Sequence, residues 1–250
     1  MHPGTLLRRL RLDVDAAMRQ DPAARSVAEV ILCYPGLHAL WVHRLSNLLW
    51  NRGLVVLPRF LSHLARFATG IEIHPGAAIG EGVFIDHGMA VVIGETAQVG
   101  DGCVLYKGVV LGGVSQARVR RHPRLGRDVV VGSNACVLGA IDVGEGARIG
   151  SGSVVIRDVP AGATVVGVPG RVVAGHRDAM DQHADLPDPV AEAIERLDRR
   201  LDRVEAASGI RREPESADGS RFDGVVEGRR DGDGAPVAIA AARRPRRKKA

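Results

Sequence analysis

Residues 125–155 read LGRDVVVGSNACVLGAIDVGEGARIGSGSVV, and an aliphatic residue returns in this stretch at every sixth position. With two interruptions, the same spacing extends back to residue 73. Thirteen positions hold it: Ile73, Ile79, Ile85, Ile93, Val99, Leu105, Leu111, Leu125, Val131, Val137, Val143, Ile149 and Val155. Eight of these residues are followed directly by glycine. A period of six matches neither the 3.6-residue period of a helix nor the two-residue alternation of an ordinary strand.

A six-residue repeat is typical of a parallel β-helix, in which short strands stack coil upon coil because none can bury its apolar side chain alone. Three hexapeptides close a triangular coil of about eighteen residues. We therefore predict an α+β chain in which residues 71–175 form a left-handed parallel β-helix. A flexible glycine-rich linker or a β-sandwich would not hold one register through thirteen positions.

The register fails at two places, and both contain histidine. The step from Ile85 to Ile93 has two residues too many and includes Asp86 and His87. The step from Leu111 to Leu125 has eight too many and ends with Arg121-His122-Pro123. Polar insertions on a rigid scaffold commonly carry function, so these two breaks are the candidate site.

The flanking segments carry helical patterns. Residues 1–70 are expected to form a helical domain, in which Asp21-Pro22 is expected to cap and start a helix through Cys33. Two further helices are expected, one ending near Gly53 and one at Gly70. Another helix is expected from Asp188-Pro189 within residues 176–208. Its apolar seam comprises Val190, Ile194, Leu197, Leu201 and Val204. Residues 209–250 are expected to be a disordered basic tail.

The net charge of +5 and the pI near 9.6 arise from the C-terminus. Residues 243–249 hold six Arg and Lys side chains, and residues 1–242 hold 28 basic against 29 acidic ones. A neutral body argues against specific binding of nucleic acid. Three scattered cysteines fit neither a disulfide framework nor a zinc motif. With no signal peptide or membrane span, we expect a cytoplasmic protein.

An ordered set of motifs resembles the serine O-acetyltransferase family over about residues 13–175. These motifs are Asp21-Pro22-Ala23, Tyr34-Pro35-Gly36-Leu37-His38-Ala39-Leu40, Thr69-Gly70-Ile71-Glu72-Ile73-His74-Pro75-Gly76-Ala77, Phe84-Ile85-Asp86-His87-Gly88-Met89, Val92-Ile93-Gly94-Glu95-Thr96, Leu111-Gly112-Gly113, Arg121-His122-Pro123 and Val165-Val166-Gly167-Val168-Pro169-Gly170-Arg171. The resemblance implies transfer of acetyl from acetyl-CoA to the hydroxyl of L-serine, which gives O-acetylserine for cysteine synthesis.

The resemblance also implies roles for individual residues. His87 corresponds to the catalytic base and Glu72 to the carboxylate that orients it, where some relatives have aspartate. Serine-binding groups correspond to Asp21, Asp86, Arg121 and His122. The CoA groove corresponds to Gly113, Ser133, Arg148, Ser151 and Arg171. No metal is implied.

Physical chemistry supports several of these roles independently. A serine hydroxyl needs a proton acceptor to attack a thioester, and imidazole, with an ordinary pKa near 6.5, suits that task. Asp86 could bind the ammonium group of serine and Arg121 its carboxylate. Glu72 and His87 are fifteen residues apart, which is close to one coil. Asp21 could equally serve only as a helix cap. His38 and His43 are expected on helix surfaces, and His74 at a corner.

Three other functions remain open at this stage. An acetyltransferase acting on a sugar would not need Asp86 and Arg121 together. A zinc hydratase on this scaffold would need three converging histidines, for which His74, His87 and His122 are the candidates. A non-catalytic scaffold would tolerate replacement of His87.

The resemblance further implies a homotrimer with sites between subunits, and inhibition by L-cysteine. Some relatives dock on O-acetylserine sulfhydrylase through a C-terminal isoleucine. This sequence ends in Lys248-Lys249-Ala250, so a stable complex with that enzyme is not expected.

Overall fold

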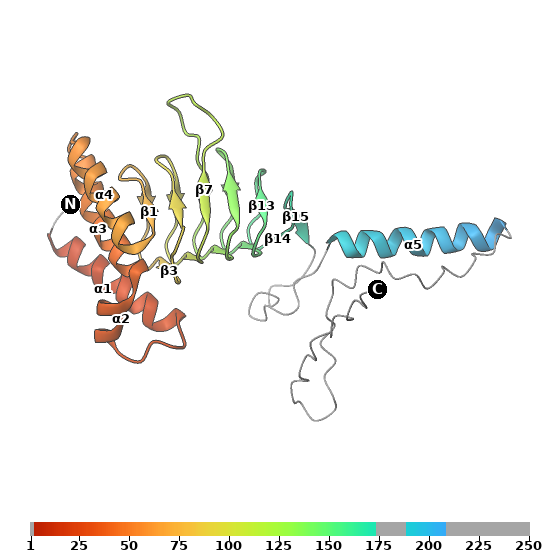
Figure 1. Cartoon of the computed structure of the whole chain (residues 1–250), viewed down its shortest axis with the longest axis horizontal. Coiled ribbons are helices and arrows are strands. Elements are labelled where there is room, and N and C mark those ends of the chain that lie inside the picture. The colour runs from red at the N-terminus through yellow and green to blue at the C-terminus, as the bar shows by residue number, and fades with distance from the viewer. Residues whose placement is uncertain (1–2, 174–188, 209–250) are drawn as a thin grey trace, which may run out of the picture. The chain divides into compact units, whose positions relative to one another are not determined.

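The computed structural model describes residues 3–173 and 189–208. Four helices come first: α1 (Pro3–Gln20), α2 (Val27–Cys33), α3 (Pro35–Trp50) and α4 (Val56–Thr69). Fifteen short strands follow up to Val173, and Figure 1 shows them stacked beside the helices. A fifth helix, α5, comprises Pro189–Ser208. Residues 174–188 and the basic tail, residues 209–250, lie outside the described residues. The expectation that the chain forms no stable complex with O-acetylserine sulfhydrylase depends on the C-terminus and so concerns residues that are not described.

The strands fall into three sheets, and successive strands of the repeat pass from one sheet to the next. Sheet A contains β1 (Glu72–Ile73), β4 (Val92–Ile93), β7 (Val110–Gly112), β10 (Cys136–Leu138) and β13 (Val154–Val155). Sheet B contains β2 (Ala78–Ile79), β5 (Gln98–Val99), β8 (Arg124–Leu125) and β11 (Asp142–Val143). Sheet C contains β3 (Phe84–Ile85), β6 (Val104–Leu105), β9 (Val130–Val131), β12 (Arg148–Ile149), β14 (Thr164–Val166) and β15 (Arg171–Val173). All pairings are parallel except that of β14 with β15.

This arrangement is the expected three-sided parallel β-helix. Every one of the thirteen repeating aliphatic residues is buried in one continuous core. The two register breaks appear as longer coils: Ile73 pairs with Ile93, and Val99 pairs with Leu125. In an uninterrupted coil, Ile93 pairs with Leu111. The extra residues therefore bulge outward while the strands keep their register, and the second insertion projects as the long loop after β7 (Figure 1).

The helices close the first coil. Leu40 of α3 belongs to the same core as the repeat, and α3 and α4 contact β1. Side chains of these helices also donate hydrogen bonds to backbone carbonyls of the first coil: Asn47 to Pro75 at 2.8 Å, and Ser62 to Ile73 at 2.6 Å. The coil has no preceding strand, so these donors take the place of one.

A buried ion pair joins α1 and α3 to the same coil. Arg44 donates from Nε to Asp13 Oδ2 at 2.7 Å and from its terminal nitrogen to the carbonyl of Gly80 at 3.1 Å. Both side chains of the pair are almost fully excluded from solvent. Burial acts to raise the pKa of Asp13, and the Arg44 guanidinium opposes it.

Two expectations about the helices are wrong. Asp21 does not cap a helix: it follows α1, and its Oδ1 accepts a 2.7 Å hydrogen bond from the backbone N–H of Ala23 in a turn. The next helix begins at Val27, because Ser26 accepts from the N–H of Glu29 and caps it instead. His43 is not on a helix surface but 4 % exposed, because α3 packs against both α4 and the first coil.

The expected end of α4 is confirmed: the helix ends at Thr69, and Gly70 caps it with a positive φ of 73°. α3 ends at Trp50, three residues before the expected Gly53, with Asn51 as its C-cap. The start of α5 at Pro189 is confirmed too. None of the described helices is long and apolar enough to cross a membrane.

Candidate active site

The first register break forms the corner at which the chain passes from sheet C to sheet A. Residues 86–91 connect β3 to β4 there. His87, Gly88 and Ala90 all have positive φ angles, of 57°, 69° and 63°. A Cβ on Gly88 would lie 2.3 Å from a methyl carbon of Ile71, so only glycine fits beneath the turn. The left-handed backbone at His87 costs free energy, and it leaves the imidazole 76 % exposed.

Asp86 lies next to this exposed histidine. Asp86 Oδ2 is 3.6 Å from His87 Nε2. Burial raises the pKa of the Asp86 carboxyl; His87 opposes this shift, and the nearby charge of Asp21 adds to it. Asp21 therefore lies close enough to act on the same corner, although it belongs to the helical segment. Two of the predicted serine-binding groups and the predicted base are thus brought together.

Tyr34 holds Asp21 in this position. Its phenolic hydroxyl donates a 2.6 Å hydrogen bond to Asp21 Oδ2, and this bond raises the pKa of Tyr34 to about 12. Tyr34 therefore remains a donor at any physiological pH. Its neighbour Gly36 places α3 against β3, because a Cβ there would meet the carbonyl oxygen of Ile85 at 2.1 Å. Sequence reasoning quoted Tyr34 within a motif but gave it no role.

Glu72 lies beside this corner, at the start of β1. Its backbone N–H donates to the carbonyl of Val91 at 2.9 Å. Its Oε2 is 3.4 Å from Arg66 Nη1, and both side chains are substantially exposed. The orienting role of Glu72 stays a prediction.

The second register break forms a different corner, where the chain passes from sheet A to sheet B. His122 is buried there, with Nδ1 accepting from the N–H of Thr96 at 3.2 Å. An accepting Nδ1 places the proton of the neutral ring on Nε2. Burial lowers the pKa of His122, in agreement with a neutral ring. A Cβ on Gly94 would lie 2.0 Å from Nε2, and one on Gly113 3.1 Å from it.

Arg121 is fixed at the same corner. Its guanidinium donates to Glu95 Oε2 at 2.7 Å, and its backbone N–H donates to Thr96 Oγ1 at 3.0 Å. Burial acts to raise the pKa of Glu95, but Arg121 and His74 outweigh it and hold that pKa below its ordinary value. Glu95 and Thr96 directly follow the Ile93-Gly94 step of the repeat. The sequence analysis did not identify either residue as part of the site. Their position at a corner of the repeat was the signal that could have identified them.

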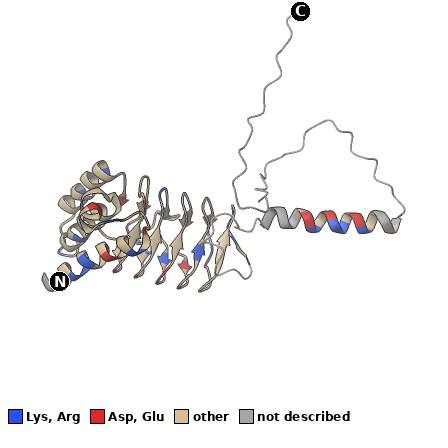
Figure 2. Cartoon of the chain, turned by 90° about the horizontal axis from the view of Figure 1, so that it is seen from below, with Lys and Arg blue, Asp and Glu red and all other residues tan. Residues whose placement is uncertain are grey.

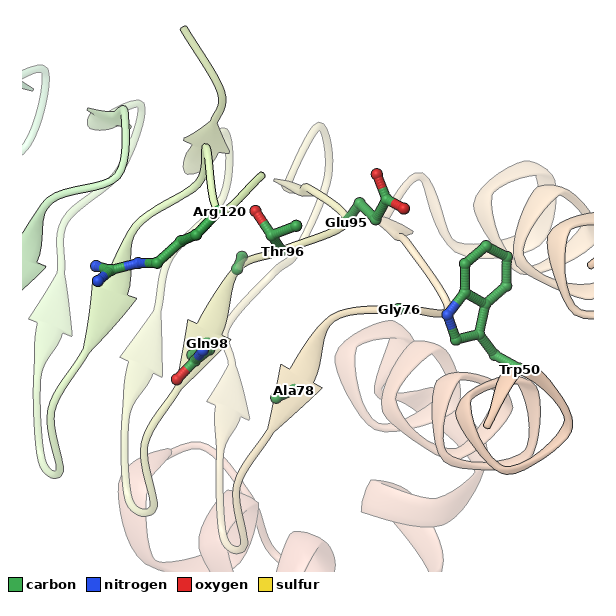
Figure 3. Close-up of a pocket in the computed structure, with 8 residues that line it drawn as sticks. Trp50, Gly76, Ala78, Glu95, Thr96, Gln98 and Arg120 are labelled. Atoms are coloured by element: carbon green, nitrogen blue, oxygen red, sulfur yellow. The ribbon is translucent and has the colours of Figure 1, made fainter. Parts of the chain in front are cut away.

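A hollow of about 330 Å³ opens next to this corner. Figure 3 shows Trp50 of α3 at one end of it and Arg120 at the other, with Glu95, Thr96 and Gln98 between them. The Trp50 ring meets His74 edge to face at 5.1 Å. Burial lowers the pKa of His74 to about 4, and His74 Nδ1 accepts from the N–H of Gly76 at 2.9 Å.

The residues predicted for the CoA groove divide between the same corners. Ser133 follows β9 and Ser151 follows β12, so both lie at the corner between sheets C and A, in line with His87. The N–H of Gly152 donates to the carbonyl of Ser133 at 2.8 Å. Gly113 lies at the other corner beside His122. Arg148 is on β12, and Arg171 is exposed on β15. Within one chain, His87 and Arg121 therefore lie at opposite ends of the strands of sheet A, at the corners with sheet C and sheet B respectively.

Comparison with known proteins decides the family. A comparison with models of known protein families gives no match. The serine acetyltransferase of Synechococcus elongatus, however, is 54 % identical over 204 residues, which cover 80 % of this chain and 82 % of that protein. The chain belongs to the serine acetyltransferase family.

Solved structures of serine acetyltransferases have a fold similar to that of this chain. A Neisseria gonorrhoeae serine acetyltransferase in complex with serine superposes with a TM-score of 0.67 and 38 % identity, over 69 % of this chain and 70 % of that one. A serine acetyltransferase in complex with cysteine gives a TM-score of 0.70 and 33 % identity, over 74 % and 73 % of the two chains.

Within the described residues, no group of three or more His, Cys, Asp or Glu side chains forms a metal-binding cluster.

Proposed function

We propose that this chain transfers the acetyl group of acetyl-CoA to the hydroxyl of L-serine, giving O-acetyl-L-serine and free CoA. The observation that carries the proposal is the exposed, left-handed His87 beside Asp86 and Asp21, in a chain that is 54 % identical over 204 residues to a serine acetyltransferase. The site offers a base and two anions at the point where a serine ammonium and hydroxyl would have to lie.

In the proposed reaction, the imidazole of His87 removes the proton of the serine hydroxyl as its oxygen attacks the thioester carbonyl. The new C–O bond forms, and the C–S bond breaks when the tetrahedral intermediate collapses. The imidazolium then returns the proton to the leaving thiolate of CoA. Glu72 is the proposed orienting carboxylate of His87, which requires its side chain to turn away from Arg66.

The remaining assignments concern the substrates. Asp21 and Asp86 are the proposed partners of the serine ammonium, and Arg121 and His122 those of its carboxylate. Gly113, Ser133, Arg148, Ser151 and Arg171 are proposed to line the CoA groove. This distribution supports a homotrimer in which the corner that carries His87 faces the Arg121 corner of a neighbouring chain, because a single chain keeps the two apart.

Further parts of the proposal follow from the family. The β-helix is proposed to be left-handed and the product to feed cysteine synthesis. The chain is proposed to comprise a helical domain, a β-helix domain and a C-terminal helical segment. L-cysteine is proposed to compete with serine, since it offers the same ammonium and carboxylate and a relative has been solved with cysteine bound. Three free cysteines support a cytoplasmic location.

The decisive experiment is an assay of thiol release from acetyl-CoA with and without L-serine, followed by identification of O-acetylserine in the product. Serine-dependent release would support the proposal. Release with a sugar acceptor but not with serine would overturn it. Equal background release with every acceptor would indicate that the chain is not an acetyltransferase.

A further inference from the structure

The helix α5 exposes an apolar seam. Ile194, Leu197, Leu201 and Val204 are 60 %, 63 %, 48 % and 60 % exposed. Charged residues occupy many of the other positions of this helix, and Figure 2 colours them along its middle part. Most of the stability of a helix in a protein comes from packing of its apolar face rather than from helix propensity. Burial of the seam is therefore the main available source of stabilisation for α5.

The shape of the seam identifies the kind of surface that it fits. Its residues are spaced three, four and three positions apart, which is the a and d pattern of a coiled coil. A helix that packs on a globular core normally has a wider apolar stripe. In heptad terms, Ile194 and Leu201 occupy a positions, and Leu197 and Val204 occupy d positions. A second helix with the same narrow seam is the matching partner.

We propose that α5 pairs with the α5 helices of other copies of this chain in a parallel, in-register coiled coil of three strands. The charges beside the seam support this direction. Arg200 lies at a g position, and Glu205, five residues later, lies at the next e position. In a parallel bundle the g position of one helix faces the e position of the following heptad on its neighbour, so these opposite charges meet. In an antiparallel pair, like edges would meet.

The helix also suits a copy of itself better than a highly charged partner. Residues 189–208 carry five acidic and four basic side chains, and Figure 2 shows the two signs mixed along α5. The seam residues by themselves do not fix the number of strands: Ile194 at a with Leu197 at d is the pattern of a two-stranded coil, whereas Leu201 at a with β-branched Val204 at d favours more than two. This inference rests on the proposed trimer for the number of strands. Chains joined through their coils would hold three α5 helices at an effective concentration on the order of millimolar.

Disulfide cross-linking of the full-length protein tests the arrangement. Ile194→Cys is made in a Cys33→Ser background, which removes the exposed native thiol. In a parallel, in-register bundle the residue at position 194 faces its own copies, so oxidation should give covalent dimers within each trimer. The matched control is Arg199→Cys, an f position on the outer side of the helix, for which we expect loss of the cross-link. Adding Leu201→Lys to Ile194→Cys should also abolish it.

The outcomes separate this inference from the proposed trimer. Cross-linking at position 194 that exceeds the control and disappears with Leu201→Lys supports the bundle. Equal cross-linking at both positions, or none at either, overturns it. The Ile194→Cys protein can also be mixed with a Val204→Cys protein. A disulfide that forms only between these two variants would indicate an antiparallel pair and would overturn the proposal as well. Sedimentation of the same samples tests the two proposals separately. A trimer without the cross-link would reject the α5 bundle and keep the proposed homotrimer. A monomer would reject both.

Discussion

Glu95 accepts a 2.7 Å hydrogen bond from the guanidinium of Arg121, so the residue proposed to bind the serine carboxylate is already held in place. The two side chains are 35 % and 25 % exposed, and the solvent weakens the pair accordingly. Glu95 also lies close enough to His74 for that ring to lower the pKa of its carboxyl. The pair therefore connects the corner proposed to bind the serine carboxylate to the hollow beside Trp50.

We expect Glu95→Gln to raise the KM for serine by about fivefold while kcat changes little, because a charge-assisted hydrogen bond that orients Arg121 is weakened. Steady-state kinetics with serine as the varied substrate measures this. The matched control is Glu145→Gln, which removes a carboxylate that pairs with Arg127 away from both corners. An unchanged KM in Glu95→Gln would show that Arg121 does not need this partner.

Replacement of His87 should remove the base without disturbing the fold. Asparagine tolerates the left-handed backbone that His87 adopts, and the exposed imidazole contributes little packing. We expect His87→Asn to lower kcat by about 10² to 10⁴, with an unchanged melting temperature. His63→Asn, at an exposed position of α4, is the control and should keep full activity. A folded His87→Asn variant with near-normal turnover would contradict the assignment.

Asp21 and Tyr34 can be separated by a pair of variants. Asp21→Asn removes a negative charge proposed to meet the serine ammonium, and we expect the KM for serine to rise by about tenfold. Tyr34→Phe removes only the hydroxyl that holds Asp21 and leaves the charge, so its effect on KM should stay within about threefold. Kinetic measurement of both variants checks the order. A larger effect from Tyr34→Phe would indicate that the hydroxyl itself contacts substrate.

The buried Asp13–Arg44 pair predicts a stability effect unrelated to catalysis. Asp13→Leu leaves Arg44 charged and buried without its partner, which should cost about 3 to 5 kcal/mol in the free energy of unfolding. Asp13→Leu combined with Arg44→Met should recover most of this loss, since it removes both charges from the interior. Urea denaturation of the three proteins measures the difference. Equal stability of the single and double variants would mean that the charges do not depend on each other.

Buried His43 predicts a pH effect. Burial lowers its pKa from 6.5 to about 3, so the unfolded chain binds a proton more readily than the folded one does. His43 therefore contributes stability that is present above pH 6.5 and is lost as the pH falls toward about 3. Between pH 7 and pH 5 the loss should be about 2 kcal/mol. His43→Leu should reduce it, which denaturation at the two pH values would show. An identical loss in the variant would exclude His43 as its source.

The repeat made much of the fold predictable. A side chain that recurs every sixth residue can be buried in register only in stacked coils, and all thirteen of these residues lie in the core. The breaks in the repeat likewise marked both candidate corners, because extra residues cannot enter the core and must bulge outward. The positions of His87 and His122 followed from this geometry.

Other features depended on contacts between distant residues. Whether Asp21 caps a helix or faces a site is decided by the hydroxyl of Tyr34, thirteen positions away. His43 lies on a helix whose pattern does not distinguish a solvent face from a face covered by another segment. The partner of Arg121 is a glutamate one coil earlier, and the choice between Glu95 and a substrate depends on side-chain rotamers. A linear pattern contains none of this information.

The hydrogen bonds from Asn47 and Ser62 to the first coil also affect how this protein behaves among its own copies. A stack of parallel strands is open-ended by construction, and its first coil would offer unpaired carbonyls on which another chain could continue the stack. Here those carbonyls are already occupied by helix side chains, and at the far end β15 runs antiparallel against β14. The repeat therefore has a fixed number of coils, and end-to-end growth into fibrils is blocked at its beginning.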